Sequence, residues 1–168
     1  MNSVAESYRI ALIRRIRILL WLFILGLVLS GATAIPLETE VTALAQWSAG
    51  KSGLAQWLQR IGDALTEVNA KYPFLAYGTD WLAFAHVVIA VAFIGPLRDP
   101  VKNVWVVEFG MVACALVVPF ALAMGSVRGI PFGWRFIDCS FGIFGIVPLW
   151  LCRRQIKRLA ELTESSRS

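Results

Sequence analysis

Two long uncharged runs, separated by a short polar turn, limit the possible folds of this chain more than any other feature. Seventeen residues without formal charge lie between Asp80 and Arg98, and 19 lie between Glu108 and Arg128. Runs of about 20 apolar residues match the hydrocarbon thickness of a bilayer. Because the connection PLRDPVKN is short, the two runs predict an antiparallel membrane hairpin over residues 79–125.

The turn contains residue types that end one helix and begin another. Gly95-Pro96 predicts the end of the first helix, because proline disfavours helical dihedrals in the residue before it. Asp99-Pro100 predicts the start of the second helix, with Asp99 as N-cap and Pro100 at the first helical position. The two helices should therefore be neighbours.

Two further apolar segments complete a predicted set of four spans. The first is uncharged after Arg17, and the last ends at a cluster of basic residues. Of the 168 residues, 58% are hydrophobic and only 16% are charged, which is unusual for a soluble protein. The sequence thus predicts an all-α polytopic membrane protein with a single membrane domain over residues 1–168. The expected spans cover about residues 16–37, 79–97, 101–125 and 134–152, and a tail follows over 153–168.

The first span has an alternative interpretation. A basic start, an apolar run and the small residues Ala32-Thr33-Ala34 are also typical of a signal peptide with its cleavage site. We favour a retained helix, because the run is long enough to cross a bilayer. Cleavage would leave three spans and a new N-terminus outside the cell.

Residues 38–78, between the first and second spans, are polar but carry a helical pattern. Apolar residues recur there at helical spacing, and polar residues separate them. These apolar residues are Leu54, Trp57, Leu58, Ile61, Leu65 and Val68. With a shorter helix over Glu38–Trp47 and a turn over Ser48–Gly53, they predict an amphipathic two-helix cap. The cap is expected to pack either on the membrane helices or on the lipid surface.

Basic residues predict the orientation, because cytoplasmic flanks of membrane spans carry an excess of Lys and Arg. Eleven of the 16 basic residues lie on the side of the termini and the 96–103 turn, and five lie on the side of the cap and the 126–133 loop. Both termini are therefore expected in the cytoplasm and the cap outside, in a bacterial inner membrane. The net charge of +5 then reflects membrane topology, and no nucleic-acid partner is expected.

Ionisable residues within spans are costly in lipid and are therefore candidates for function. Those near the expected outer face are Asp80, His86, Arg128, Arg135 and Asp138. Two carboxylates, one imidazole and two guanidiniums on one side favour a pocket for an anionic small molecule or lipid headgroup, or an acid–base site.

Each of these residues also has a structural interpretation. Asp80 is placed to be the N-cap of the second span, and His86 to bond a carbonyl as a neutral imidazole. Arg135 and Asp138 are three residues apart on one helical face and are expected to form an ion pair. Arg128 is the alternative partner of Asp138.

Arg98, Asp99, Lys102 and Glu108 lie near the expected inner face. Glu108 is the candidate for function among them. Because it lies less than two helical turns from Lys102, we expect an ion pair with Lys102 or with Arg98. The alternative is a proton or ion pathway through Glu108, although the chain lacks the repeated halves common in transporters.

Small residues on the third and fourth spans favour close helix packing. They are Gly110, Cys114, Val117, Ala121 and Gly125 on the third span and Gly142 and Gly145 on the fourth. Neither a metal nor a cofactor is expected, because the chain has one histidine and no closely paired cysteines. A disulfide is also not expected, since the three cysteines lie at different depths.

The stretches DWLAFAH, FIGPLRDPVKN, GIPFGW and IDCSFG resemble small bacterial four-helix multi-pass membrane proteins of uncharacterised activity. A VanZ-like pattern is similar in its four spans, in an acidic residue before a histidine and in a late Arg–Asp–Gly series. However, Asp80 and His86 are further apart than in that pattern, and the Arg135–Asp138–Gly142 stretch lacks its asparagine. No VanZ-like function is therefore carried over.

The leading functional hypothesis is a non-enzymatic integral membrane protein, able to form a homo-oligomer, with an outward polar pocket. One alternative is a membrane enzyme that acts on a lipid or isoprenoid headgroup through Asp138 and His86. The other is a small proton-coupled transporter that uses Glu108.

Overall fold

The computed structural model describes residues 3–48 and 53–165, and every regular element in these ranges is a helix. Within these ranges, four segments are long and apolar enough to cross a membrane by length and composition. They are Glu6–Ala34, Pro73–Arg98, Val104–Val127 and Phe132–Ser165. The predictions of an all-α fold and of four candidate spans are therefore confirmed.

The chain divides into two compact units. The first unit contains residues 1–25 and 91–168, and the second contains residues 26–90. Helix α1 (Ser3–Ala34) contributes to both units, because the boundary falls within it. Most of α4 (Tyr77–Ala92) belongs to the second unit.

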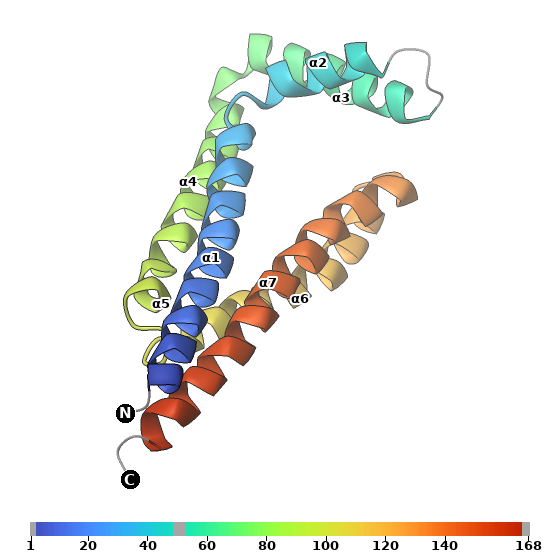
Figure 1. Ribbon diagram of the computed structural model, residues 1–168. Coiled ribbons are helices and arrows are strands. Elements are labelled where there is room, and N and C mark those ends of the chain that lie inside the picture. Colours follow the sequence, from blue (N-terminus) through green and yellow to red (C-terminus); the bar gives the residue numbers. More distant parts are fainter. Residues whose placement is uncertain (1–2, 49–52, 166–168) are drawn as a thin grey trace. The chain divides into compact units, whose positions relative to one another are not determined.

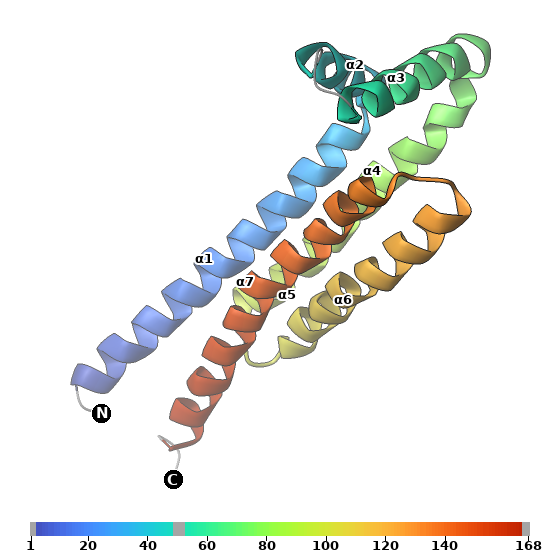
Figure 2. The same cartoon turned by 90° about the vertical axis from the view of Figure 1, so that its right-hand side faces the viewer.

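Helices α6 (Val104–Val127) and α7 (Phe132–Ser165) form an antiparallel hairpin in the first unit (Figures 1 and 2). The prediction that small residues on these spans permit close helix packing is confirmed for this pair. A Cβ added at Gly142 would overlap the backbone carbonyl oxygen of Cys114, and one at Gly145 would lie 2.8 Å from the Cys114 sulfur. The missing side chains let the two backbones approach closely.

The part of α1 that belongs to this unit completes its core. Leu12, Ile16 and Leu20 are each at most 1% exposed. The ring of Phe23 lies 4.7 Å from that of Phe93, which is itself fully buried. The start of α1 and the end of α7 lie at the same end of the unit (Figure 1).

The connection between α4 and α6 differs in detail from the prediction. Helix α4 ends at Ala92, and a short helix, α5 (Ile94–Arg98), contains the Gly95-Pro96 pair that was expected to end it. Pro96 is tolerated there because the first turn of a helix leaves its N–H groups unpaired.

The predicted N-cap role of Asp99 is wrong, because α6 begins only at Val104. Asp99 Oδ1 instead accepts a hydrogen bond from the Lys102 backbone N–H at 3.0 Å. The Asn103 side chain donates to the carbonyl oxygens of Gly95 and Asp99 at 3.2 and 2.9 Å. These polar groups therefore stabilise a turn between the helices.

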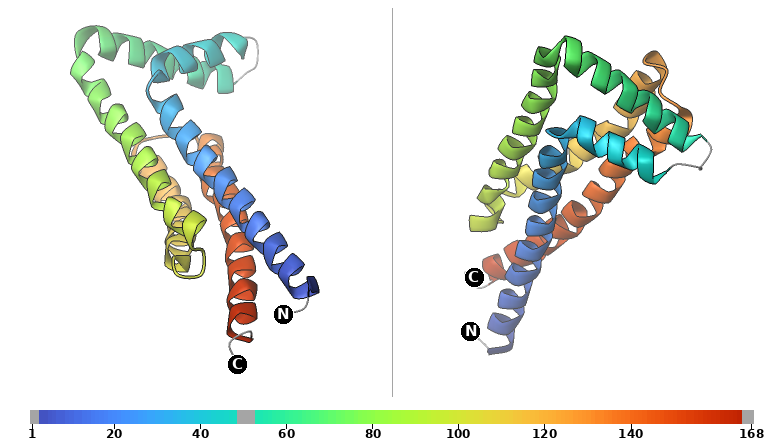
Figure 3. Two further views of the ribbon diagram at one scale, coloured as in Figure 1. Left: turned by 60° about the vertical axis from the view of Figure 1, so that its left-hand side comes forward. Right: turned by 90° about the horizontal axis from the view of Figure 1, so that it is seen from above.

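The second unit contains the predicted pair of amphipathic helices, α2 (Leu37–Trp47) and α3 (Leu54–Lys71), followed by the 3₁₀ helix η1 (Pro73–Ala76) and α4. Helices α2 and α3 run side by side (Figure 3). Residues 49–52 of the predicted turn lie outside the described residues.

Side-chain hydrogen bonds join α2 and α3. Glu38 accepts hydrogen bonds from Thr66 Oγ1 and Asn69 Nδ2, both at 2.7 Å, so each carboxylate oxygen has a partner. These bonds lower the pKa of Glu38, the Asn69 bond most and the Thr66 bond next.

Candidate functional site

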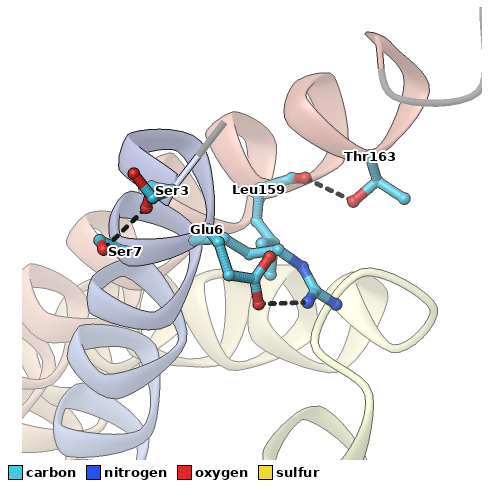
Figure 4. Close-up of polar contacts among 6 residues, drawn as sticks. Ser3, Glu6, Ser7, Leu159 and Thr163 are labelled. Carbon is cyan, nitrogen blue, oxygen red and sulfur yellow. Dashed lines mark hydrogen bonds and ion pairs between the residues drawn. The ribbon is translucent and has the colours of Figure 1, made fainter. Parts of the chain in front are cut away.

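A groove of about 490 Å³ lies at the end of the first unit where α1 starts and α7 ends. Its walls come from α1, from the α5–α6 turn and from the last turns of α7. Figure 4 shows this region, where the Thr163 hydroxyl donates to the Leu159 carbonyl at 2.9 Å and Glu6 pairs with Arg9 at 3.6 Å. We call this cavity the terminal groove.

The floor of the terminal groove is apolar. Ile16 of α1, Pro96 of α5 and Leu159 of α7 all line it and are buried. The three residues come from segments far apart in the sequence, and the helical packing of the first unit brings them together. Such a floor suits an apolar part of a ligand.

The rim of the groove is basic. Arg9, Arg17, Arg98 and Lys102 line it, together with the carboxylates of Asp99 and Glu164. Arg9 is already paired with Glu6. Among the described residues, no carboxylate oxygen lies within 4 Å of a charged nitrogen of the other three.

Local sequence explains how these cations come together. Arg9, Ile13 and Arg17 are spaced by four residues, so they lie along one face of α1. Arg98 ends α5, and Lys102 belongs to the turn that Asp99 stabilises. An apolar floor below guanidinium and ammonium groups that have no carboxylate partner in the described ranges suits an amphiphile with a phosphate group, because guanidinium binds phosphate oxygens well.

The predicted ion pair between Arg135 and Asp138 is wrong. Arg135 Nε donates to the Ile130 carbonyl at 2.9 Å, and its Nη1 donates to Ser126 Oγ at 2.6 Å. Side chains on a helix point toward its N-terminus, so Arg135 reaches the α6–α7 loop and not Asp138 one turn later. It lies against Gly125, where a Cβ would be 2.8 Å from Arg135 Cγ.

Asp138 is half-buried in the first unit. Within the described ranges, no basic nitrogen lies within 4 Å of its carboxylate, so neither Arg135 nor Arg128 is its partner there. Arg128 is exposed at the end of α6, where its backbone N–H bonds the Met124 carbonyl. The structure therefore does not join these three predicted site residues by ion pairs.

The other two residues of the predicted outer pocket, Asp80 and His86, belong to the second unit. Asp80 lies in the first turn of α4, which begins at Tyr77, so the predicted N-cap position is wrong. His86 Nδ1 lies 2.8 Å from the Leu82 carbonyl oxygen, as expected for an imidazole that donates to a carbonyl. A Cβ at Gly31 of α1 would lie 3.0 Å from His86 Cβ, so the two helices approach closely here.

Glu108 pairs with a different cation from either predicted partner. Its Oε1 accepts a hydrogen bond from Arg153 Nε at 2.6 Å. This bond joins the start of α6 to α7 and depends on the register of the α6–α7 hairpin. Both side chains remain partly exposed, at 44% for Glu108 and 34% for Arg153.

Sequence reasoning missed the terminal groove because it assigned Arg9 and Arg17 to membrane topology, and Arg98 and Lys102 to an ion pair with Glu108. The spacing of Arg9, Ile13 and Arg17 was the available signal. Among the described residues, no group of three His, Cys, Asp or Glu side chains could hold a metal ion. No protein-family model, curated protein or solved structure matches this chain.

Proposed function

We propose that this chain is a non-enzymatic integral membrane protein that binds a phosphate-bearing anionic headgroup in the terminal groove. The observation that carries the proposal is the pairing of a buried apolar floor with three basic side chains that have no carboxylate partner among the described residues. A phospholipid presents the same combination, with phosphate next to glycerol and acyl groups.

Binding is favoured over catalysis by the surroundings of the acid–base candidates. His86 bonds a main-chain carbonyl. Among the described residues, the Asp138 carboxylate has no basic partner. Glu108 is engaged by Arg153, which supports a structural role more than a proton pathway. These contacts do not assemble a nucleophile, base and orienting group.

The orientation is part of the proposal. The excess of basic residues on the side of the termini, 11 of 16, supports an orientation with the terminal groove at the cytoplasmic face of a bacterial inner membrane and residues 38–78 outside. Anionic lipids attract basic residues at such a surface by about 1 kcal/mol each. Impermeant maleimide should label Ser52→Cys from outside intact cells but not Ser165→Cys. Labelling of Ser165→Cys from outside would contradict this orientation.

A triple variant tests the groove. Arg17→Gln, Arg98→Gln and Lys102→Gln together remove three basic groups, so affinity for phosphatidylglycerol should fall by about 3 kcal/mol, or roughly 100-fold. The matched control, Arg60→Gln with Lys71→Gln and Arg128→Gln, removes the same charge elsewhere. The readout is thermal stabilisation of the detergent-solubilised full chain by added phosphatidylglycerol, with phosphatidylcholine as the neutral lipid.

The expected result is stabilisation by phosphatidylglycerol in the wild type and the control, and its loss in the triple variant. Equal responses of the two triple variants would contradict a site in the groove. Inorganic phosphate at millimolar concentration distinguishes the source of the anion. If it reproduces the whole effect, the ligand is a free phosphate; if not, the lipid is required.

A further inference from the structure

Helices α2 and α3 meet along a buried line of contact, to which each helix contributes two residues. Val41 and Ala45 of α2 and Leu58 and Gly62 of α3 are buried. A Cβ at Gly62 would lie 3.9 Å from Val41, so this glycine lies against α2. Positions around each helix can be measured from this line at about 100° per residue.

The polar contacts of the pair lie on one side of that line. Glu38 is three residues before Val41, and Thr66 is four residues after Gly62, so each lies about 40–60° to one side of the buried line. Their hydrogen bond shows that these sides of the two antiparallel helices coincide. Gln59 and Asp63, which are bonded to each other at 2.8 Å, lie on the same side of α3.

The opposite side is apolar on both helices. Leu44 lies 100° from Ala45 and 60° from Val41, which puts it about 80° from the buried line in the other direction. Ile61 has the same spacing to Gly62 and Leu58 and therefore the same position on α3. Leu37 and Leu54 share that side at about 60°. Leu44 is 48% exposed and Leu54 is 43% exposed, and the other two are partly exposed. We call these four residues the apolar side of the pair.

Both ends of the pair continue into candidate membrane spans. Ile35 and Pro36 alone separate α2 from α1, and α3 is followed by Tyr72 and then by the candidate span Pro73–Arg98. The residues at the second junction are aromatic and exposed: Tyr72 43%, Phe74 70%, Tyr77 62% and Trp81 55%. Tyrosine and tryptophan are typical of the interface between membrane and water. A bilayer crossed by these two candidate spans would have its headgroups next to both ends of the pair.

We infer that the apolar side of the α2–α3 pair lies on the surface of the lipid bilayer, with the Glu38–Thr66 side facing water. The lipid surface is the occupant that fits both the position of the pair between two candidate spans and its division into one apolar and one polar side. An amphipathic helix in this position buries its apolar side about 5–10 Å into the boundary between headgroups and acyl chains.

Site-directed spin labelling of the full chain in phosphatidylcholine–phosphatidylglycerol vesicles tests this inference. Leu44→Cys and Ile61→Cys report on the apolar side, and Thr42→Cys and Asp63→Cys, each two residues away, are the matched controls. The native Cys114, Cys139 and Cys152 are buried, and the unmodified chain carried through the same labelling is the blank. Power saturation then compares collisions with oxygen, which is enriched in lipid, and with a water-soluble nickel chelate.

Labels at residues 44 and 61 should meet oxygen more often and the nickel chelate at least several-fold less often than labels at 42 and 63. Equal nickel accessibility in both members of each pair would show that the apolar side faces water, and would overturn the inference. Low accessibility to both reagents at 44 and 61 would also overturn it, because protein would then cover this side.

Discussion

Gly142 offers the sharpest test of the packing in the first unit. A Cβ at this position would overlap the backbone carbonyl oxygen of Cys114 and would lie 3.1 Å from Val117 Cβ. A backbone carbonyl cannot rotate away as a flexible side chain can. In the substitution Gly142→Ala, α6 and α7 must therefore move apart.

The magnitude follows from two opposing terms. Overpacking costs about 1–3 kcal/mol, and a backbone contact places this site in the upper part, about 2–3 kcal/mol. Alanine recovers about 1 kcal/mol through its better helix propensity. Gly142→Ala should thus lower the free energy of unfolding by about 1–2 kcal/mol, and the bulkier Gly142→Val should lower it further.

Gly133→Ala in the same helix is the matched control, because an added Cβ there would meet no atom within 4 Å apart from its chain neighbours and the backbone of its own helix. This control should leave stability unchanged or raise it by up to about 1 kcal/mol. Equilibrium unfolding by sodium dodecyl sulfate in mixed micelles, followed by tryptophan fluorescence, measures both variants. Equal stabilities of Gly142→Ala and Gly133→Ala would refute the close approach of α6 and α7.

Three further predictions concern polar contacts. The Glu108–Arg153 pair is tested by a double-mutant cycle of Glu108→Gln and Arg153→Gln in the same unfolding assay. Because the pair is partly exposed, its coupling energy should be about 1–2 kcal/mol. Additive effects of the two substitutions would contradict the pairing. Arg135→Met should lower the unfolding free energy by about 1–3 kcal/mol through loss of its bonds to Ile130 and Ser126, and an unchanged value would exclude its role in holding the α6–α7 loop. Because hydrogen bonds lower the pKa of Glu38 in the folded state, its contribution to stability is complete above the usual pKa of about 4.5 and is lost as pH falls through the folded value. Between pH 6 and pH 3 the melting temperature should therefore fall further in the wild type than in Glu38→Gln, and parallel curves would contradict this role.

The sequence predicts the helices well because their main determinant is the length of uncharged runs. Helix ends were harder to predict. Helix α1 begins at Ser3, well before the predicted span, which starts at about residue 16. Arginine is a good helix former, so the basic residues at the edge of the apolar span do not end the helix. Helix α7 continues to Ser165, in keeping with the amphipathic spacing of Ile156, Leu159 and Leu162 beyond the basic cluster.

Side-chain partners could not be predicted from the sequence for two physical reasons. The contact of Glu108 with Arg153 joins residues 45 apart and depends on how α6 is aligned along α7. Sequence spacing alone favoured the nearer cations on the same segment. For Arg135, spacing placed Asp138 on the same face, but the direction of side chains on a helix took Arg135 to the Ile130 carbonyl instead.

The terminal groove was hidden for a related reason. Its floor of Ile16, Pro96 and Leu159 comes from three separate segments, and each segment looks like an ordinary end of a membrane span. Arg17 and Arg98 line the same cavity because α1 packs against α7 and the connection between α5 and α6.

The most direct test of headgroup binding is native mass spectrometry of the full chain extracted in mild detergent from membranes that contain phosphatidylglycerol and phosphatidylcholine. The wild type should retain one phospholipid per chain, with the anionic lipid enriched over its share of the membrane. The Arg17→Gln, Arg98→Gln, Lys102→Gln variant should lose this adduct, and the Arg60→Gln, Lys71→Gln, Arg128→Gln control should keep it. A wild type without bound phospholipid, or an adduct equally abundant in the two triple variants, would contradict the terminal groove as a headgroup site.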